Sequence, residues 1–376
     1  MMNNIGIYIH VPFCVQKCKY CDFCSFEKTS EKEREDYTCA LCNELVKKAK
    51  DAKKRRVDTV FFGGGTPSLL SNDQLARIFS CLRENYEIEE NAEITLELNP
   101  ATANKEKFQF LLSLGVNRLS IGMQSSSDGE LSALGRIHTA EDFLSTFRAA
   151  REAGFHNINA DVMYGIPHQT KESFSRTLDT LIACDCEHIS AYGLKIEENT
   201  PFFRMRDSLP LPTEDEEYEM YLLAAEKLKD AGYTHYEISN YAKNGKECLH
   251  NLRYWRAEEY LGFGVAAYSY FDGVRYGNER DIEEYIKNNG CCEKTDVEEI
   301  KTEKDRESEY IMLRFRLHEG ICESDFATKF GVSFKEKYQI QLEKFLSSEY
   351  MKKEDERYFL TDKGMYVSNS ILLEFI

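Results

Sequence analysis

The sequence predicts an α/β fold: a partial, TIM-like barrel of six β/α units, (β/α)6, followed by an α-rich C-terminal domain that resembles a winged helix. Two observations predict the barrel. Short β-rich runs alternate with amphipathic helical stretches, and the most polar motifs follow directly after these runs. The C-terminal domain is predicted because the alternation stops near Glu303 and helical stretches follow. A doubly wound parallel sheet is the competing architecture, since it also gathers functional groups at the carboxyl ends of its strands.

Six runs rich in apolar and β-branched residues are the candidate strands. They cover residues 5–9, 57–62, 93–98, 117–121, 157–162 and 188–193. Helical spacing of apolar residues marks the stretches between them, for example Phe143, Phe147 and Ala150 within 141–152. Because helical stretches separate consecutive strands, we expect parallel pairing through right-handed crossovers.

We expect the chain to divide into three parts. Residues 1–235 form the barrel core, which ends with a helix over 213–231 and a short run after it. Residues 236–302 are rich in Gly and aromatic side chains, so we predict an irregular segment that packs on the barrel. Residues 303–376 form the small α-rich domain.

The charge and hydropathy of the chain argue against a nucleic-acid partner and against an integral membrane segment. Its 376 residues carry a formal net charge of −17, from 65 acidic and 48 basic residues. Proteins that bind nucleic acid usually present a basic face, so this charge argues against a nucleic-acid partner. No run of about 18 apolar residues occurs, so we expect no integral membrane segment. The N-terminal residues lack a basic region, and they favour a first strand over a signal peptide.

The cysteines indicate a metal site in a reducing compartment. Of 13 cysteines, four lie within the 11 residues from Cys14 to Cys24. Disulfide frameworks are typical of small secreted chains, whereas clustered cysteines in a chain of this length favour a metalloprotein. We therefore expect a cytoplasmic protein.

The segment CVQKCKYC, with Cys14, Cys18 and Cys21, follows directly after the first candidate strand. Thiolates hold iron–sulfur clusters, and three ligands on a four-iron cluster leave one iron open to another molecule. Structural zinc sites usually split their ligands into two separated pairs, and the spacing also differs from a bacterial ferredoxin repeat. Cys24 is either a fourth ligand or a thiol beside the cluster, and we favour the second interpretation.

Other polar groups follow later candidate strands. The glycine triplet of FGGGTP follows the second strand, where glycine lets the backbone approach a ligand and Thr66 adds a hydroxyl. Glu97 ends the third strand in LELNP, and Gln124 follows the fourth. Asp161 lies inside the fifth strand among apolar neighbours, where a charge is costly unless it is bonded or faces a polar pocket.

These motifs together resemble those of radical S-adenosylmethionine (SAM) enzymes. CxxxCxYC after a first strand is the signature of that superfamily, and YIHVPFCVQKCKYCDF is similar to its oxygen-independent coproporphyrinogen III oxidase branch. Within that branch, Asp22-Phe23 and Ser25 resemble the HemW-type heme chaperones. The resemblance extends from Tyr8 to the segment LTDKGMYVSN near the C-terminus.

The resemblance implies two cofactors and the residues that hold them. A [4Fe–4S] cluster is held by Cys14, Cys18 and Cys21, and the barrel is the radical SAM core. SAM is bound by the positions that match the family's motifs, namely Tyr8, Tyr20, Gly64, Gly65, Thr66, Glu97, Gln124, Arg136 and Asp161. Packing and ligand binding are equal alternatives for Arg118 and Ser120, and we assign no catalytic residue. Reductive cleavage of SAM is the chemistry implied, driven by an electron donor.

The segment HNLRYW, residues 250–255, is the candidate heme-binding segment. Imidazole is a common axial ligand of heme iron, and Arg253 could meet a propionate while Tyr254 and Trp255 flank the porphyrin. The alternative is that His250 is a hydrogen-bonded structural histidine. The resemblance to the HNxxYW motif of heme chaperones implies that His250 binds heme. We treat His138, His156, His168, His188, His235 and His318 as structural or surface residues.

Three functions are compared. The leading one is a heme chaperone that binds heme and delivers it to apo-hemoproteins such as respiratory enzymes, with peripheral membrane association through a partner. The alternative is the oxidase itself, which decarboxylates coproporphyrinogen III to protoporphyrinogen IX. True oxidases carry a further cysteine in a CxC arrangement and an N-terminal extension, whereas Phe23 stands at that cysteine position here. A radical SAM tRNA-modifying enzyme is the third candidate, and the net charge of −17 argues against it.

Overall fold

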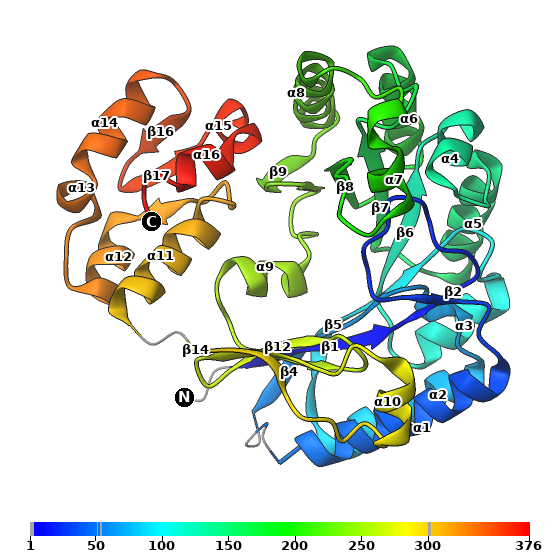
Figure 1. Cartoon of the computed structure of the whole chain (residues 1–376). Helices are drawn as coiled ribbons and strands as arrows, with labels where there is room; N and C mark the ends of the chain where they lie inside the picture. The colour runs from blue at the N-terminus through cyan, green and yellow to red at the C-terminus, as the bar shows by residue number, and fades with distance from the viewer. Residues whose placement is uncertain (1–3, 51, 53–54, 300–301) are drawn as a thin grey trace.

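The computed structural model describes residues 4–50, 52, 55–299 and 302–376. Its main feature is one curved, 12-stranded sheet (Figure 1). In spatial order its strands are β14 (Thr295–Glu299), β13 (Val274–Gly277), β12 (Tyr268–Phe271), β11 (Tyr260–Phe263), β1 (Ile5–Val11), β4 (Arg56–Gly64), β5 (Glu87–Leu98), β6 (Arg118–Gln124), β7 (Ile158–Tyr164), β8 (His188–Gly193), β10 (Asn240–Ala242) and β9 (Thr234–Glu237). The strands from β11 to β8 pair in parallel, and those at both ends pair antiparallel.

The predicted fold class is confirmed, because all six predicted strands lie next to one another in this parallel array. Successive side chains of β1 point to opposite faces of the sheet. Ile5, Ile7 and Ile9 are fully buried in the main apolar core. Tyr8 and His10 alternate with these isoleucines and line cavities on the inner side of the sheet.

The structure differs from the expected irregular segment at 236–302. Residues 260–263 form β11, which pairs in parallel with β1 and adds a seventh strand to the array. Strands β12 to β14 then continue the sheet as an antiparallel edge. These strands have only four or five residues each, and glycines interrupt them, so local propensity gives a weak signal there. Pairing with β1 supplies the order that the local sequence lacks.

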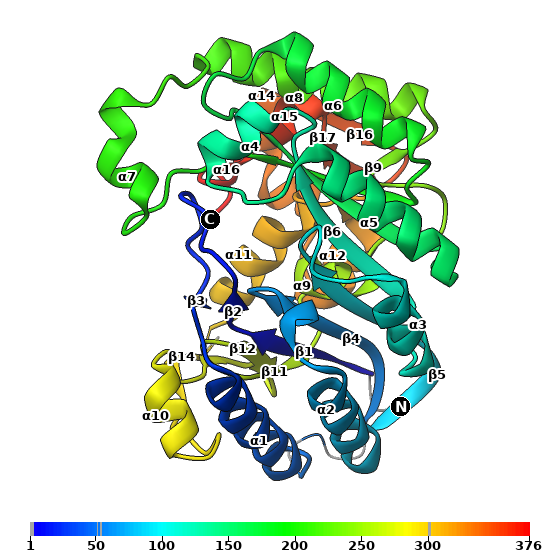
Figure 2. The same cartoon turned by 90° about the vertical axis from the view of Figure 1, so that its right-hand side faces the viewer.

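Helices cover the outer face of the sheet (Figure 2). On this face lie α1 (Glu31–Lys48), α2 (Asn72–Asn85), α3 (Lys105–Ser113), α5 (Ala140–Ala153) and α6 (Lys171–Ala183). The other helices of this part of the chain are α4 (Asp128–Leu134), α7 (Pro201–Met205), α8 (Glu214–Asp230), α9 (Leu249–Trp255) and α10 (Ile282–Lys287). Helix α9 lies on the inner side of the sheet (Figure 1), where His250 and Tyr254 line a cavity. Short elements are β2 (Phe13–Cys14), β3 (Phe26–Glu27), η1 (Pro67–Leu69) and η2 (Arg206–Ser208). Capping boxes begin several of the longer helices, for example Ser30 with Glu33 at α1, which satisfies backbone N–H groups that have no partner inside the helix.

The C-terminal unit is α-rich, as predicted. Its elements are α11 (Glu303–Arg314), β15 (Ile321–Cys322), α12 (Glu323–Phe330), α13 (Phe334–Lys337), α14 (Gln339–Ser347), β16 (Met351–Glu354), β17 (Arg357–Leu360), α15 (Asp362–Tyr366) and α16 (Ser368–Leu372). The three strands form a small sheet, and the rings of Phe315, Phe326 and Phe334 pack in the core of the unit. The unit joins the large sheet at its β9 edge, where the N–H of Ile238 donates to the carbonyl of Arg316 (2.9 Å).

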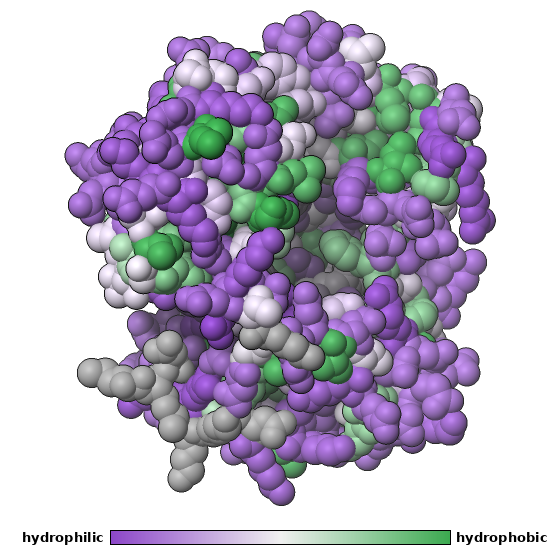
Figure 3. All heavy atoms as spheres, turned by 60° about the vertical axis from the view of Figure 1, so that its left-hand side comes forward, coloured by the Kyte–Doolittle hydropathy of each residue, from purple (hydrophilic) through white to green (hydrophobic). Residues whose placement is uncertain are grey.

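The surface is mostly hydrophilic. Figure 3 shows one face dominated by polar side chains, with a recess near its middle whose walls include hydrophobic groups. Among the described residues, no helix is both long and apolar enough to cross a membrane.

Candidate functional site

The cysteine loop leaves the carboxyl end of β1 and is pinned by its backbone from two sides. The N–H of Lys19 donates to the carbonyl of Leu134 at the end of α4 (3.0 Å), and the N–H of Phe202 in α7 donates to the carbonyl of Lys19 (3.1 Å). The side-chain amide of Gln16 donates to the carbonyl of Gly135 (3.0 Å). These contacts hold the loop in place without using a thiol.

Cys14, Cys18 and Cys21 lie in this loop as free, partly buried thiols, and all 13 cysteines of the chain are free. Burial raises the pKa of Cys18 and of Cys21. The nearby Arg136 guanidinium opposes this effect at Cys18. The thiol of Cys24 donates instead to the carbonyl of Arg280 (3.5 Å), in the loop after β13. That bond directs Cys24 toward another element.

The glycine triplet after β4 lies against the start of the cysteine loop. Gly64 has φ +106°, and a Cβ there would lie 2.3 Å from the His10 ring. A Cβ on Gly65 would lie 2.7 Å from the carbonyl oxygen of Phe13, and the Gly65 N–H donates to the carbonyl of Val11 (2.8 Å). Only glycine fits at these two positions.

A chain of hydrogen bonds connects the glycine loop to the cysteine loop. Thr66 Oγ1 accepts from Asn99 (2.8 Å) and lies 3.8 Å from Cys14 Sγ. Asn99 Oδ1 in turn accepts from Arg136 (2.6 Å), which also donates to the Tyr20 hydroxyl (2.6 Å). Three predicted SAM residues thus meet through Asn99. Sequence reasoning missed Asn99, although it stands two residues after Glu97 in LELNP.

Gln124 ends β6 in the same region. Its backbone has φ +67°, a strained conformation for a residue other than glycine. A Cβ on Gly122 would meet Gln124 Nε2 at 3.0 Å and Asn99 Oδ1 at 3.3 Å, so the three groups are close neighbours. Strain of this kind is found at functional sites, where the surroundings enforce it.

A polar cavity of about 150 Å³ lies inside the barrel. It is lined by Tyr8, Phe61, Glu97, Arg118, Ser120, Asn159, Asp161, Ser190, Tyr192, His250, Asn251 and Tyr254. Burial, together with the neighbouring Asp161, raises the pKa of Glu97 to about 8. Burial also raises the pKa of Asp161, although Asn159 (2.8 Å) and Ser120 (3.2 Å) donate to its carboxylate. Two buried acids that face one cavity favour a cationic ligand.

Arg118 is the main compensating charge of the cavity. It is fully buried, and its Nε has no hydrogen-bond partner among the described residues. Its positive charge lies close to Glu93 and Asp161. Arg136 likewise has a buried Nε without a partner in the described part of the chain. Buried donors of this kind are costly unless a ligand or water satisfies them.

His250 is buried in the wall of the same cavity. Its Nδ1 is hydrogen-bonded to the Thr59 hydroxyl (2.9 Å) and its Nε2 to the Tyr254 hydroxyl (2.8 Å). Burial and the nearby Arg253 lower the pKa of His250 to about 3, so the ring is neutral. The phenol ring of Tyr8 stacks on it with centroids 6.5 Å apart. In this conformation His250 can bind a metal through Nε2 only after the bond to Tyr254 breaks.

The other residues of HNLRYW have structural partners. Arg253 is buried, forms an ion pair with Asp58 and donates to the carbonyl of Asn4 (3.3 Å). It is therefore not placed to meet a propionate, contrary to the expectation from sequence. Trp255 packs against a small apolar cluster that includes Leu317 of the C-terminal unit. Asn251 and Tyr254 line the cavity beside His250, and Tyr254 also lines a second cavity.

A second cavity, of about 350 Å³, lies between the cysteine loop and β11 to β13. It is lined by Tyr8, His10, Asp22, Phe23, Cys24, Tyr254, Tyr260, Ala266, Tyr268 and Arg280. Tyr8 and Tyr254 line both cavities. His10 connects this region to the cysteine loop, because its Nδ1 is bonded to the Tyr8 hydroxyl (3.0 Å) and its Nε2 to the carbonyl of Cys24 (2.8 Å).

Comparisons with known proteins agree with this arrangement. Residues 8–181 match the radical SAM superfamily, and residues 302–367 match the HemN C-terminal domain. The chain is 34% identical to heme chaperone HemW of Bacillus subtilis, with 98% of each chain covered. It is 35% identical to heme chaperone HemW of Escherichia coli, over 99% of this chain and 98% of that protein.

The fold is also that of a solved structure. Coproporphyrinogen III oxidase (HemN) from Escherichia coli, a radical SAM enzyme, superposes with a TM-score of 0.87. The match covers 99% of this chain and 90% of that chain at 22% sequence identity. At this identity the likeness supports the fold and no more.

Proposed function

Since the chain belongs to the HemW family of heme chaperones within the radical SAM superfamily, we propose that it binds heme and delivers it to apo-hemoproteins. Its cofactors are a [4Fe–4S] cluster and SAM, and heme is the ligand that it carries. The observation that carries the proposal is the position of Tyr254, the hydrogen-bond partner of His250. Tyr254 lines both the cavity with the buried acids and the aromatic cavity beside the cysteine loop.

We assign the cluster to Cys14, Cys18 and Cys21. The chemistry of the donor set fits, because the loop offers three thiols without disulfide partners and its backbone is anchored independently of them. Cys24, bonded to the carbonyl of Arg280, is assigned a place beside the cluster rather than on it. When bound and reduced, the cluster supplies an electron to the carbon–sulfur bond of SAM.

We assign SAM to the strand ends around the barrel cavity. Glu97 and Asp161 provide negative charge for the ammonium and sulfonium groups, and Arg136 provides a donor for the carboxylate. Gly64, Gly65 and Thr66 bring backbone and hydroxyl groups to the same edge. Tyr8, Tyr20 and Gln124 complete the set. The unpartnered Nε of Arg136 and the raised pKa of Glu97 support the assignment, because a carboxylate would satisfy this donor and a cation would favour the ionised acid.

Binding of SAM is expected to release close to one proton from Glu97 at about pH 7. With a pKa of about 8, Glu97 is mostly protonated in the free protein, and a cation beside it favours the ionised form. Calorimetry in two buffers with different ionisation enthalpies measures this release. Glu97→Gln abolishes it, whereas Glu90→Gln, an exposed change on the same strand, preserves it. Equal proton release in Glu97→Gln would assign the proton to another group.

Heme binding is assigned to His250 and the aromatic cavity beside it. Tyr254, Tyr260 and Tyr268 offer aromatic faces for a porphyrin, and Arg280 offers a cation for a carboxylate. Movement of the Tyr254 side chain away from His250 would free Nε2, which lies 2.8 Å from the Tyr254 hydroxyl oxygen in this structure. The protein then has an imidazole for the iron, which is the usual axial ligand.

Titration with heme tests this assignment. The wild-type chain gives a Soret band whose intensity saturates, and His250→Ala loses at least about nine-tenths of the binding, because the axial bond is removed. Tyr254→Phe retains binding, since the phenyl ring cannot hold Nε2. His156→Gln, at an exposed histidine, behaves as the wild type. Unchanged heme affinity in His250→Ala would reject the ligand. Decarboxylation of coproporphyrinogen III by the SAM-loaded, reduced protein would instead support an oxidase.

The acceptors and the electron donor belong to the same proposal. We propose apo-hemoproteins such as respiratory enzymes as acceptors, reached through a peripheral protein contact at the membrane, and a cytoplasmic electron donor for the cluster. The 13 free thiols support a reducing compartment.

A further inference from the structure

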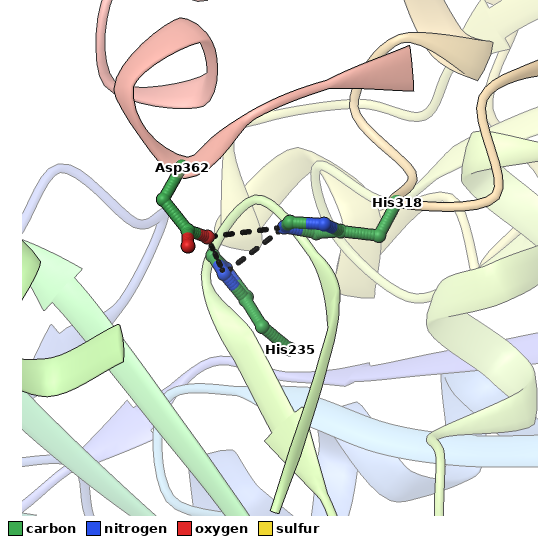
Figure 4. A group of neighbouring side chains, drawn as sticks. All are labelled: His235, His318 and Asp362. Carbon is green, nitrogen blue, oxygen red and sulfur yellow. Dashed lines mark hydrogen bonds and ion pairs between the residues drawn. The ribbon is translucent and has the colours of Figure 1, made fainter. Parts of the chain in front are cut away.

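Two histidines and an aspartate meet where the β9 edge of the sheet joins the C-terminal unit (Figure 4). His235 lies on β9, His318 in the loop after α11, and Asp362 is the first residue of α15. His235 Nδ1 lies 2.9 Å from Asp362 Oδ1 and 3.0 Å from His318 Nε2, and the third separation is 3.6 Å. The sequence showed no such group, because 83 and 127 residues separate His235 from its two partners.

The backbone holds these side chains in place. The N–H of His318 donates to the carbonyl of Tyr236 (3.0 Å), so the two histidine-bearing segments run side by side. The ring of His235 stacks on Tyr241 with centroids 4.1 Å apart and 14° between the planes. Thr361 caps α15 by accepting from the N–H of Gly364 (3.1 Å), which orients Asp362. The three side chains are thus presented by independent, ordered elements.

The separations are those of atoms around one cation. Donor atoms bound tetrahedrally to zinc at about 2.0–2.1 Å lie about 3.3 Å from one another. Hydrogen bonds account for the triad less well. If His235 Nδ1 carries the proton, that one proton lies between two acceptors, Asp362 Oδ1 and His318 Nε2. If His318 Nε2 carries the proton instead, His235 Nδ1 and Asp362 Oδ1 are two acceptors 2.9 Å apart with no proton between them. His235 Nε2 has no partner among the described residues, so only the triad sets its tautomer.

The surroundings also suit a cation. The His235 side chain is 9% exposed and that of His318 is 24% exposed, while Asp362 is 45% exposed and opens the site to water. Three protein ligands with one side open to solvent match the pattern of a zinc site that keeps a position for water.

We propose that His235, His318 and Asp362 form a zinc-type divalent cation site that joins the β9 edge of the barrel sheet to the C-terminal unit. Imidazole nitrogen and carboxylate oxygen are the donors that zinc takes in such sites. This site is separate from the cysteine loop and from His250, and it does not depend on the proposed heme function. Its occupancy stabilises the contact between the two parts of the chain.

Zinc alone tests the site, in protein whose cysteine loop has been filled anaerobically with iron and sulfide. After chelation and dialysis against Zn²⁺, the wild type retains one zinc per chain in addition to iron. The zinc X-ray absorption edge then shows nitrogen and oxygen neighbours near 2.0–2.1 Å and no sulfur near about 2.3 Å. His318→Gln and Asp362→Asn weaken zinc binding by about a hundredfold or more. His156→Gln, at an exposed histidine, leaves it unchanged.

A second measurement covers variants that lose stability. Zinc at about a hundredfold excess over its Kd raises the Tm of the wild type by about 4 °C. The same zinc leaves the Tm of His318→Gln and Asp362→Asn unchanged, while their iron content stays that of the wild type. Equal zinc retention in wild type and both variants, or sulfur around the bound zinc, overturns the proposal. Absence of bound zinc in the wild type does so as well and leaves a hydrogen-bonded triad.

Discussion

Replacing Cys14, Cys18 or Cys21 with alanine, one at a time, is expected to abolish the iron–sulfur cluster. The wild-type chain should hold about four irons after anaerobic reconstitution, and each variant close to none. Two remaining thiolates cannot hold a cuboidal cluster against loss to solvent, and no other described cysteine shares their loop except Cys24. Iron and sulfide analysis with electron paramagnetic resonance of the reduced protein measures the outcome.

Two further alanine variants make this experiment specific. Cys39→Ala changes an exposed thiol on α1 and should retain the full iron content. Cys24→Ala should also retain it, because that thiol is directed to the carbonyl of Arg280. Iron loss in Cys24→Ala would make Cys24 a ligand. A full cluster in any of the three variants of the loop would remove that cysteine from the ligand set.

The Glu93→Ala variant is expected to lower the free energy of unfolding by about 3–5 kcal/mol, the typical cost of removing one partner of a buried charge pair. The Glu93 carboxylate accepts the N–H groups of Leu249 (3.1 Å) and His250 (3.0 Å), which begin α9. It also lies beside the buried Arg118. Without it, two backbone donors at the start of α9 lose their acceptor, and the buried Arg118 guanidinium loses a nearby negative charge.

Denaturant unfolding and hydrogen exchange check this prediction together. The loss of stability should be accompanied by faster exchange of the amides of α9, and by weaker heme binding, since α9 carries His250. Glu90→Ala is the matched control, because it removes an exposed carboxylate from the same strand and should change stability by about 0.5 kcal/mol or less. If both variants lose stability equally, the helix-capping role of Glu93 is incorrect.

Local sequence was sufficient for the parts of the site that follow a strand directly. Cys14, the glycine triplet, Glu97 and Gln124 each stand at the carboxyl end of a run that local pattern identifies, and parallel strands bring such ends to one edge. Asp161 was found because a charge inside an apolar strand requires a polar environment, and it does line the cavity. Asn99 was not predicted, because the local sequence does not distinguish an asparagine that bonds to site residues from an ordinary loop asparagine.

The HNLRYW motif shows the opposite case. The motif suggested that Arg253 meets a heme propionate. In the structure Arg253 instead contacts Asp58 and Asn4, which are far from it in the sequence. The same holds for β11, whose four residues become the seventh parallel strand only by pairing with β1. Side-chain partners of this kind are set by long-range packing and cannot be deduced from spacing.

The sequence by itself determined the order of β/α units, the loop that carries three thiols and the acids at the strand ends, because each depends on residues a few positions apart. Only the tertiary structure decided that His250 is neutral and bonded at both nitrogens, that Arg253 is buried in an ion pair, and that His235, His318 and Asp362 meet. The physical reason is that these states arise from burial and from contacts between elements that the chain separates by tens to more than a hundred residues.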